Sequence, residues 1–407
     1  MASKIFKLNN NKGEFLISPS ILQKYYQQFY PCELIVKWLT KNDDSLLKRR
    51  EFCFTLLNDK YIRYQSFKSL SEIEKRISNL NPMKIDIGGI YNKEPKNYNE
   101  HKEEENLICQ EKELVFDIDI TDYDEVRRCC KKADVCSKCW KYIVSGAKIL
   151  DRILVEDFGF TKIFYVFSGR RGIHCWVSDK RACILKKEGR TAIERYIYYE
   201  KVNQNISDNN RTKRNFLPPI HPSYLRAVSI IKNDFYEILN EQDLLSDDNL
   251  KKIFRNIIYS YFNPIDIDYI DDILNKKNLN SLKKFNIISQ YLKAGEKILK
   301  KKDITYCNAD ACLNEFMMYI LYPRLDSNVT IQVNHLLKGP FCVHPKTGYI
   351  SVPMSIEKLK NFFLDKIPKI EYLIENDNNN EKNIFFEFVK YFENFVKNIN
   401  GNNDINE

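Results

Sequence analysis

Long apolar segments are absent from this sequence. No run of 18 apolar residues occurs among its 407 residues, so we expect no transmembrane helix. Residues 1–6 lack the apolar core of a secretion signal, and the chain is therefore expected to stay inside the cell. A Gly-x-x-x-x-Gly-Lys-Ser/Thr motif is also missing, which argues against an ATPase motor.

The composition that is present indicates a large globular chain. Length and a hydrophobic content of 43% allow two or three folding units. The formal net charge of +9 suits a polyanion without establishing one. Twelve cysteines in an intracellular chain favour thiols and metal ligands over a disulfide framework.

One stretch, residues 114–120, alternates apolar residues with carboxylates. This period of two predicts a half-buried β-strand with Asp117 and Asp119 on the face opposite the core. Two carboxylates about 6.5–7 Å apart on one strand face repel each other unless a cation lies between them. One or two divalent metal ions are the usual solution, although a solvated strand face is the alternative for a bare Asp-x-Asp.

Four cysteines lie within eleven residues just after that strand: Cys129, Cys130, Cys136 and Cys139. A Cys-x-x-Cys turn suits tetrahedral zinc, although the adjacent pair departs from the commoner arrangement of two such turns. The alternatives are a reduced cluster without metal and a redox site, and nothing nearby supplies a partner for redox chemistry.

Two strands, residues 163–167 and 173–177, flank a short basic turn. The turn places Ser168, Arg170 and Arg171 at its tip, and His174 follows on the second strand. Guanidinium forks match phosphate oxygens, and exposed turn amides add donors, so the motif predicts an anion site. A basic surface hairpin is the alternative.

An earlier hairpin is predicted by the alternating segments 49–56 and 61–67, which turn around residues 58–59. Glu51 and Arg63 are single charges within these apolar strands, which is costly unless they are paired or functional. A structural ion pair between the two is the simpler interpretation. Helical spacing over residues 20–39, with a break at Pro31, and a strand at 83–91 complete this region.

The second half of the chain alternates between helical and strand-like segments. We expect a helical insert over residues 186–303 with a loop-like region at 203–215. Strand-like character returns at residues 322–326, 335–340 and 344–348. Residues 384–399 form an amphipathic helix whose apolar stripe should pack against this chain or a partner subunit.

Five motifs together resemble one family, and they occur in the family's order: residues 49–67, 111–119, 129–139, 168–176 and 323–346. Clustered carboxylates beside Arg, Lys and His are also what nucleotidyl transfer requires. The motifs are similar to those of the small, catalytic subunit of eukaryotic DNA primase, of the archaeo-eukaryotic primase family. The similarity covers roughly residues 15–180 and 305–355 and is looser elsewhere.

The resemblance implies roles for individual residues. Asp117, Asp119 and Asp326 would bind two catalytic Mg²⁺ or Mn²⁺ ions, and Glu51 matches an active-site acid of unassigned role. Nucleotide binding is implied for Arg63, Ser168, Arg170, Arg171, His174, Asp326, His335, Lys338 and His344. The four cysteines match a structural Zn²⁺ site.

The expected fold is mixed α/β, with a primase-type catalytic core of packed β-sheets and helices. We assign residues 1–185 and 304–370 to that core, 186–303 to the helical insert, and 371–407 to a linker and the C-terminal helix. The implied function is two-metal synthesis of RNA primers from ribonucleoside triphosphates on a single-stranded DNA template, in the nucleus. The implied partners are the large primase subunit and the DNA polymerase alpha complex, with no membrane.

Two other functions fit part of the pattern. A non-catalytic, zinc-stabilised nucleic-acid-binding subunit would keep the basic turn but would not need three carboxylates. A repair-type primase-polymerase would share the site and favour deoxynucleotides.

Overall fold

The computed structural model describes residues 17–97, 107–199, 220–262, 267–301, 308–361, 366–375 and 379–401. The described residues fall into two compact units, divided within strand β5. We call residues 119–158 and 197–324 the helical unit. The remainder, up to 118, 159–196 and from 325 onward, is the sheet unit. The predicted loop at 203–215 lies outside the described residues.

The sheet unit contains both β-sheets of the described residues. Its helices are α1 (Pro19–Gln28), α2 (Cys32–Thr40), η1 (Asp44–Arg49), α3 (Leu70–Leu80), η2 (Pro95–Asn97), α5 (Lys180–Cys183), α6 (Lys187–Ile197), α13 (Ser327–Ile331), α14 (Ile356–Lys360), α15 (Ile370–Glu375) and α16 (Asn379–Gly401). Its strands are β1 (Arg50–Thr55), β2 (Tyr61–Gln65), β3 (Lys84–Tyr91), β4 (Cys109–Glu111), β5 (Leu114–Asp119), β6 (Ile163–Phe167), β7 (Gly172–Val177), β8 (Leu337–Lys338) and β9 (Pro353–Met354).

The first sheet has the order β2-β1-β3-β4, and β8 also pairs with β3. Strands β1 and β2 form the predicted antiparallel hairpin, with Thr55 opposite Tyr61. Strand β1 pairs with β3 from Lys84 to Ile90, whereas β8 pairs at Asp86 and β4 pairs at Ile90. The short β8 therefore brings Lys338 beside the start of β3.

The second sheet has the order β5-β7-β6-β9. Strands β6 and β7 form an antiparallel hairpin in which Phe167 lies opposite Ile173, so residues 168–171 form its loop. The alternation predicted for β5 is confirmed at Phe116 and Ile118, which are buried beside half-buried Asp117. Val115 is also buried although it shares the face of Asp117, because both faces of β5 are covered at that end.

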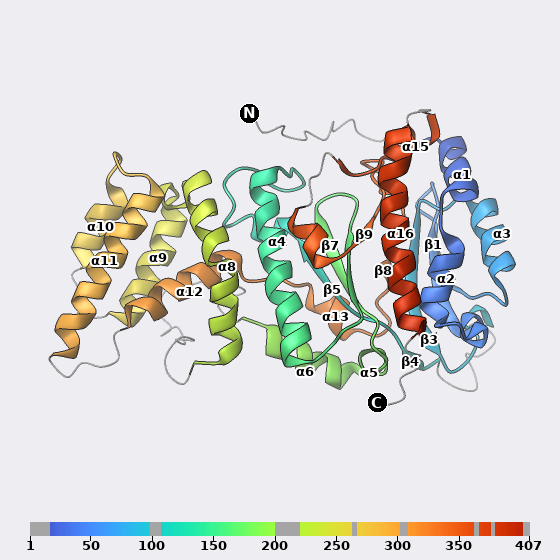
Figure 1. Ribbon diagram of the computed structural model, residues 1–407, viewed down its shortest axis with the longest axis horizontal. Helices are drawn as coiled ribbons and strands as arrows, with labels where there is room; N and C mark the ends of the chain where they lie inside the picture. Colours follow the sequence, from blue (N-terminus) through green and yellow to red (C-terminus); the bar gives the residue numbers. More distant parts are fainter. Residues whose placement is uncertain are drawn as a thin grey trace. The chain divides into compact units, whose positions relative to one another are not determined.

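The C-terminal helix α16 packs on the core of its own chain, as its apolar stripe predicted. Phe392 is fully buried and its ring lies 5.7 Å from Trp38 and 5.5 Å from Phe164. Helix α16 also lies beside α2, so segments from opposite ends of the chain share one core (Figure 1).

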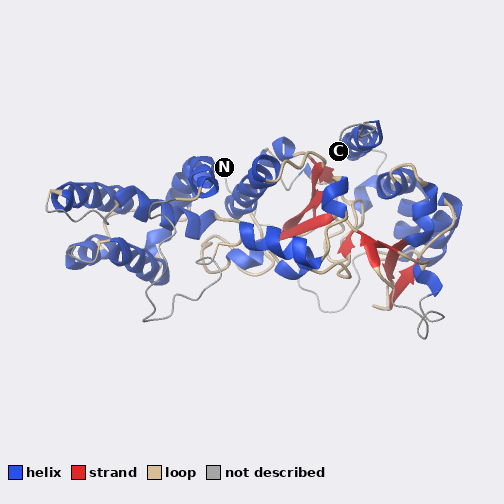
Figure 2. Cartoon of the chain, turned by 90° about the horizontal axis from the view of Figure 1, so that it is seen from below, coloured by secondary structure: helices blue, strands red, loops and turns tan. Residues whose placement is uncertain are grey.

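The helical unit is built from helices in its described residues (Figure 2). They are η3 (Ile120–Tyr123), α4 (Ser137–Arg152), η4 (Ile153–Asp157), α8 (Pro222–Glu241), η5 (Leu244–Ser246), α9 (Asp248–Tyr261), α10 (Ile267–Asn275), α11 (Ser281–Lys300) and α12 (Ala309–Leu321). Helix α12 is apolar almost all round because it packs against α8, α9 and α11 together. Among the described helices, none combines the length and apolar character that a membrane span requires.

Three sequence expectations need correction. Residues 322–326 form no strand and connect α12 to α13. Of residues 335–340 only Leu337–Lys338 is a strand, and residues 344–348 form a turn around the carbonyl of His344. Residues 370–375 form helix α15 within the segment expected to begin the linker.

Candidate functional site

The loop of the β6–β7 hairpin is closed by its own first residue. Ser168 N–H donates to Gly172 O at 2.9 Å, and Ser168 Oγ accepts from Gly172 N–H at 3.1 Å. Gly169 has φ +88°, and a Cβ at this position would lie 2.7 Å from the Cβ of His344. Only glycine meets both requirements without strain. The loop therefore holds Arg170 and Arg171 on a fixed turn pressed against the segment that carries His344.

That second segment is tied to the loop by hydrogen bonds. Lys338 Nζ donates to Ser168 O, and Thr347 Oγ1 donates to Gly169 O at 2.7 Å. His344 Nδ1 accepts from Lys346 N–H at 3.3 Å, which places the proton of the neutral imidazole on Nε2. The structure thus brings together five residues predicted to bind nucleotide, which we call the cationic cluster: Arg170, Arg171, His174, Lys338 and His344.

The titratable groups of the cationic cluster have lowered pKa values. Burial, reinforced by Lys338, lowers the pKa of His174 to about 3. Burial lowers the pKa of His344 to about 3 as well, with further lowering by Lys338 and by Arg170 and Arg171. The pKa of Lys338 falls to about 8, again chiefly because it is buried. Burial is the main cause of these shifts, and the neighbouring positive charges that add to it at both histidines favour an anion at this place.

His174 lies close to the first of the predicted metal carboxylates. Its Nε2 is 3.9 Å from Asp117 Oδ1, which is too long for a hydrogen bond, and with a pKa of about 3 its neutral ring forms no ion pair near pH 7. In the part of the chain that the structure describes, His174 Nδ1 is buried without a hydrogen-bond partner. Buried polar atoms are normally satisfied, so an additional ligand is expected at this ring.

The three predicted metal carboxylates occupy different settings. Asp117 points from the middle of β5 with 27% of its side chain exposed. Asp119 ends β5, and its Oδ1 accepts from both the N–H and the hydroxyl of Thr121 at 2.8 Å. Asp326 is the exposed N-cap of α13, and its N–H donates to Asp117 O at 3.3 Å. The structure therefore places the backbone of Asp326 directly beside Asp117.

Lys84 and Asp86 belong to the same neighbourhood and were not singled out from the sequence. They lie 3.0 Å apart on β3, and Asp86 is opposite Lys338 in the β3–β8 register. Burial raises the pKa of Asp86, whereas Lys84 and then Lys338 oppose that rise. Two charged residues at alternate positions in an otherwise apolar strand were the available signal.

Glu51 and Arg63 form the ion pair that was the simpler interpretation of the sequence. Arg63 Nε donates to Glu51 Oε1 at 3.0 Å, and the same carboxylate accepts from Tyr64 N–H at 3.3 Å and from Tyr91 OH at 2.9 Å. Gly88 packs so closely that a Cβ there would lie 2.9 Å from Glu51 Cβ. Glu51 is therefore a fully engaged buried carboxylate, and a catalytic role for it stays a prediction.

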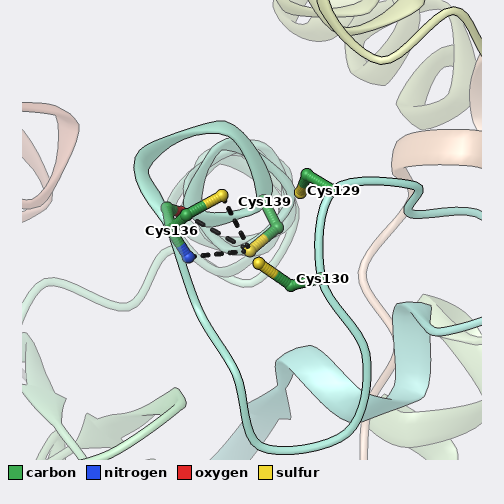
Figure 3. Close-up of side chains that lie close together, drawn as sticks. All are labelled: Cys129, Cys130, Cys136 and Cys139. Carbon is green, nitrogen blue, oxygen red and sulfur yellow. Dashed lines mark hydrogen bonds between the residues drawn. The ribbon is translucent and has the colours of Figure 1, made fainter. Parts of the chain in front are cut away.

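The four cysteines of the predicted zinc site converge in the helical unit (Figure 3). Their sulfur atoms all lie within 4.8 Å of one another, and Cys136 Sγ is 3.9 Å from Cys139 Sγ. Tetrahedral zinc with bonds of about 2.3 Å needs sulfurs about 3.8 Å apart, so these residues fit a metal ion. Buried Arg127 donates to Cys139 Sγ at 3.7 Å, which suits a thiolate.

All eleven cysteines of the described residues are free thiols. The four of the cysteine cluster come from two places, the loop before α4 and its first turn. Among described residues, no other group of three or more His, Cys, Asp or Glu gathers its ligand atoms closely enough to hold a metal ion. Cation binding by Asp117, Asp119 and Asp326 accordingly stays a prediction.

Comparison with known proteins gives a consistent result. Residues 116–356 match the family described as DNA primase small subunit. The chain is 36% identical to a DNA primase small subunit of Caenorhabditis elegans, over 93% of this chain and 96% of the relative. It is 37% identical to that of Saccharomyces cerevisiae, over 94% and 92%. An archaeal relative, the DNA primase small subunit PriS of Picrophilus torridus, is 28% identical over 80% of both chains.

Proposed function

Since this chain belongs to the DNA primase small subunit family, we propose that it is a catalytic primase subunit that joins ribonucleoside triphosphates into a short RNA primer on single-stranded DNA. The observation that carries the proposal is the cationic cluster beside Asp117. Two histidines, a buried lysine and two arginines meet there, and burial lowers the pKa of the lysine and of both histidines. A triphosphate offers the oxygen acceptors and the negative charge that such a group of donors binds.

The residues of the cluster divide the binding of a nucleotide among them. Arg170 and Arg171 offer planar forks for phosphate oxygens, and Lys338 adds a compact charge fixed by its bond to Ser168 O. Neutral His344 offers its Nε2–H as a hydrogen-bond donor, and His174 lies on the side of the cluster next to Asp117. A bound phosphate would raise the pKa of both histidines, because it removes the excess positive charge around them.

Catalysis of the nucleotidyl transfer is assigned to the carboxylates. Asp117, Asp119 and Asp326 provide hard oxygen donors that suit two Mg²⁺ or Mn²⁺ ions. Such ions, when bound, stabilise the negative charge that develops on the transferring phosphoryl group. The residues of the chain orient the nucleotide against them, with Arg63 and His335 completing its surroundings. The cysteine cluster is assigned to a structural Zn²⁺ ion that takes no part in the chemistry.

The family also suggests the assembly in which the chain works. We propose that it acts in the nucleus with the large primase subunit and the DNA polymerase alpha complex. Its net charge of +9 suits a template and a growing primer that are both polyanions.

Primer synthesis by the purified chain tests the function. The chain is incubated with single-stranded DNA, labelled ribonucleotides and either Mg²⁺ or Mn²⁺, and oligoribonucleotides are resolved by length. The proposal requires template-dependent RNA products. Template binding without synthesis would instead favour a non-catalytic nucleic-acid-binding subunit, and products made only from deoxynucleotides would favour a repair-type primase-polymerase.

A further inference from the structure

Residues 332–335 connect two parts of the proposed nucleotide site. They follow α13, whose N-cap is Asp326, and they precede β8, which carries Lys338. This connecting segment forms neither helix nor strand; His335 N–H donates to Gln332 O within it at 3.3 Å, and further donors to its backbone carbonyls come from elsewhere. Whatever fixes the connecting segment also fixes the spacing between Asp326 and Lys338.

Side chains from the first sheet and its β4–β5 connection supply those donors. Lys112 Nζ donates to Gln332 O at 3.1 Å and to His335 O at 2.6 Å. Arg63 donates to Asn334 O at 3.3 Å. Lys112 is only 2% exposed, so its two bonds are shielded from competition with water. A single ammonium group thus holds both ends of the connecting segment.

Lys112 is itself fixed by a buried network. Its N–H donates to Cys183 O at 2.9 Å, and its carbonyl accepts from Arg190. The next residue, Glu113, forms a two-pronged ion pair with Arg50 at 2.8 and 3.0 Å. Buried charges are retained at a cost and are strongly coupled to their partners. These contacts therefore fix the backbone from which the ammonium group of Lys112 extends.

We propose that Lys112 is a positioning residue for nucleotide binding, which acts by holding the connecting segment so that Asp326 and Lys338 keep the spacing that a metal-bound triphosphate requires. This inference rests on the proposed function of the cationic cluster. Lys112 contacts backbone carbonyls of the segment, and its effect reaches the nucleotide through them.

The charge state of Lys112 gives the proposal a second signature. Burial, followed by Arg190, lowers the pKa of Lys112 to about 7. Cys109 and Glu113 act in the opposite direction, and Arg50 lowers the pKa slightly further. The ammonium group that holds the segment is therefore present below about pH 7 and is lost above it, so positioning should weaken as the pH rises.

The test compares three variants of the full chain by the dissociation constant of ATP in the presence of Mg²⁺. Lys112→Met should bind ATP about tenfold more weakly than the wild type, since small displacements of binding groups are costly. Lys112→Arg, which keeps a charged donor, should restore most of the affinity. Lys284→Met is the matched control, because buried Lys284 also donates to two carbonyls, Leu245 O at 3.4 Å and Leu274 O at 2.7 Å, but within the helical unit.

A purely structural role would appear as equal effects of Lys112→Met and Lys284→Met on ATP binding, and this result would overturn the proposal. The pH profile supplies the second criterion. The dissociation constant of the wild type, divided by that of Lys112→Arg, should rise several-fold between about pH 6.5 and 8.5, because arginine stays charged. A flat ratio would also overturn the proposal.

ATP binding is measured without synthesis, so this inference and the proposed function can fail separately. If the wild type makes no primers but Lys112→Met still binds ATP tenfold more weakly, the proposed reaction is wrong and the positioning role stands. If primers form normally and Lys112→Met binds ATP like the wild type, the positioning role is wrong and the reaction stands.

Discussion

The cysteine cluster and the cationic cluster are assembled in opposite ways. The four cysteines lie within eleven residues of one segment, so a single loop and the first turn of α4 bring them together. The cationic cluster joins a hairpin loop to residues 170 positions away, as the bond from Lys338 to Ser168 shows. The first site needs only local structure, whereas the second exists only after two sheets have formed. Each can therefore be broken without the other.

The largest effect is expected from the carboxylates that accompany the cationic cluster. Asp117→Ala and Asp119→Ala should each reduce primer synthesis by about a thousandfold or more, because charge stabilisation of a transferring phosphoryl group is lost. Folding should change little for Asp117→Ala, since the Asp117 side chain is half-buried and is not part of the apolar core. Synthesis is measured at saturating Mg²⁺ and Mn²⁺.

Asp119 requires a separate control, because its carboxylate also caps η3 through Thr121. Asp119→Asn keeps an acceptor for that cap and removes the negative charge. If Asp119→Asn or Asp117→Ala retained near-normal synthesis at saturating metal, the assignment of these residues to the catalytic ions would be wrong. Zinc content should remain unchanged in every variant, since the cysteine cluster is assembled locally.

Arg170→Lys and Arg171→Lys should produce the next largest effect. Each keeps the charge and loses the two-pronged fork, and a lost charged hydrogen bond costs about 1.5–3 kcal/mol. The KM for nucleotide should therefore rise by about one to two decades, with little change in the affinity for single-stranded DNA. Both constants are measured on each variant. Weaker DNA binding with a normal nucleotide KM would show that the arginines hold the template instead.

Removal of the metal tests the other site. If Cys129, Cys130, Cys136 and Cys139 bind one zinc ion, chelation should lower the melting temperature by about 10 °C or more, because structural zinc contributes folding free energy directly. ATP affinity well below the melting temperature should persist. Elemental analysis of carefully prepared protein gives the zinc content per chain, and a value near zero would rule out the site.

The same contrast explains what the sequence could predict. The cysteine cluster, the β1–β2 hairpin and the β6–β7 hairpin depend on neighbours in the chain, and each is where local pattern placed it. The two-residue strand β8 is too short to produce a periodic signal, yet it sets the position of Lys338. The approach of His344 to Gly169 and the reach of Lys112 to residues 332–335 are tertiary contacts with no local signature.

The remaining predicted site residues came from the resemblance to a family. The residues that the sequence did not reveal were missed for physical reasons. Lys84 and Asp86 lie on a strand that was expected, but from the sequence alone their charges resemble those of ordinary solvent-exposed residues. The β3–β8 pairing places them beside Lys338. Residues 322–326 were expected to be strand-like, although they include two charged residues, Arg324 and Asp326. They adopt a connection instead, because α13 begins immediately at Ser327.

The smallest predicted effect concerns the helix that supports the long-range site. Helix α16 buries Phe392 against Phe164 of β6 and against Phe341, whose ring lies 5.7 Å away and which stands between Lys338 and His344 in the sequence. Phe392→Ala should cost about 3–5 kcal/mol of stability, as for other buried phenylalanines. In a chain of this size, the melting temperature should then fall by several degrees, roughly 5–10 °C.

Phe386, on the same helix, is the matched control because this residue is 50% exposed and its ring only partly packs, 6.3 Å from the ring of Phe29, so Phe386→Ala should cost about 1–1.5 kcal/mol, clearly less than Phe392→Ala. The two variants remove the same atoms from one helix and differ in what those atoms contact. If the loss follows burial, the heated Phe392→Ala variant should lose ATP binding at a lower temperature than the temperature at which it releases zinc. The reason is that α16 packs within the sheet unit. Equal melting temperatures for the two variants, measured by thermal denaturation, would mean that α16 does not stabilise the sheets that assemble the cationic cluster.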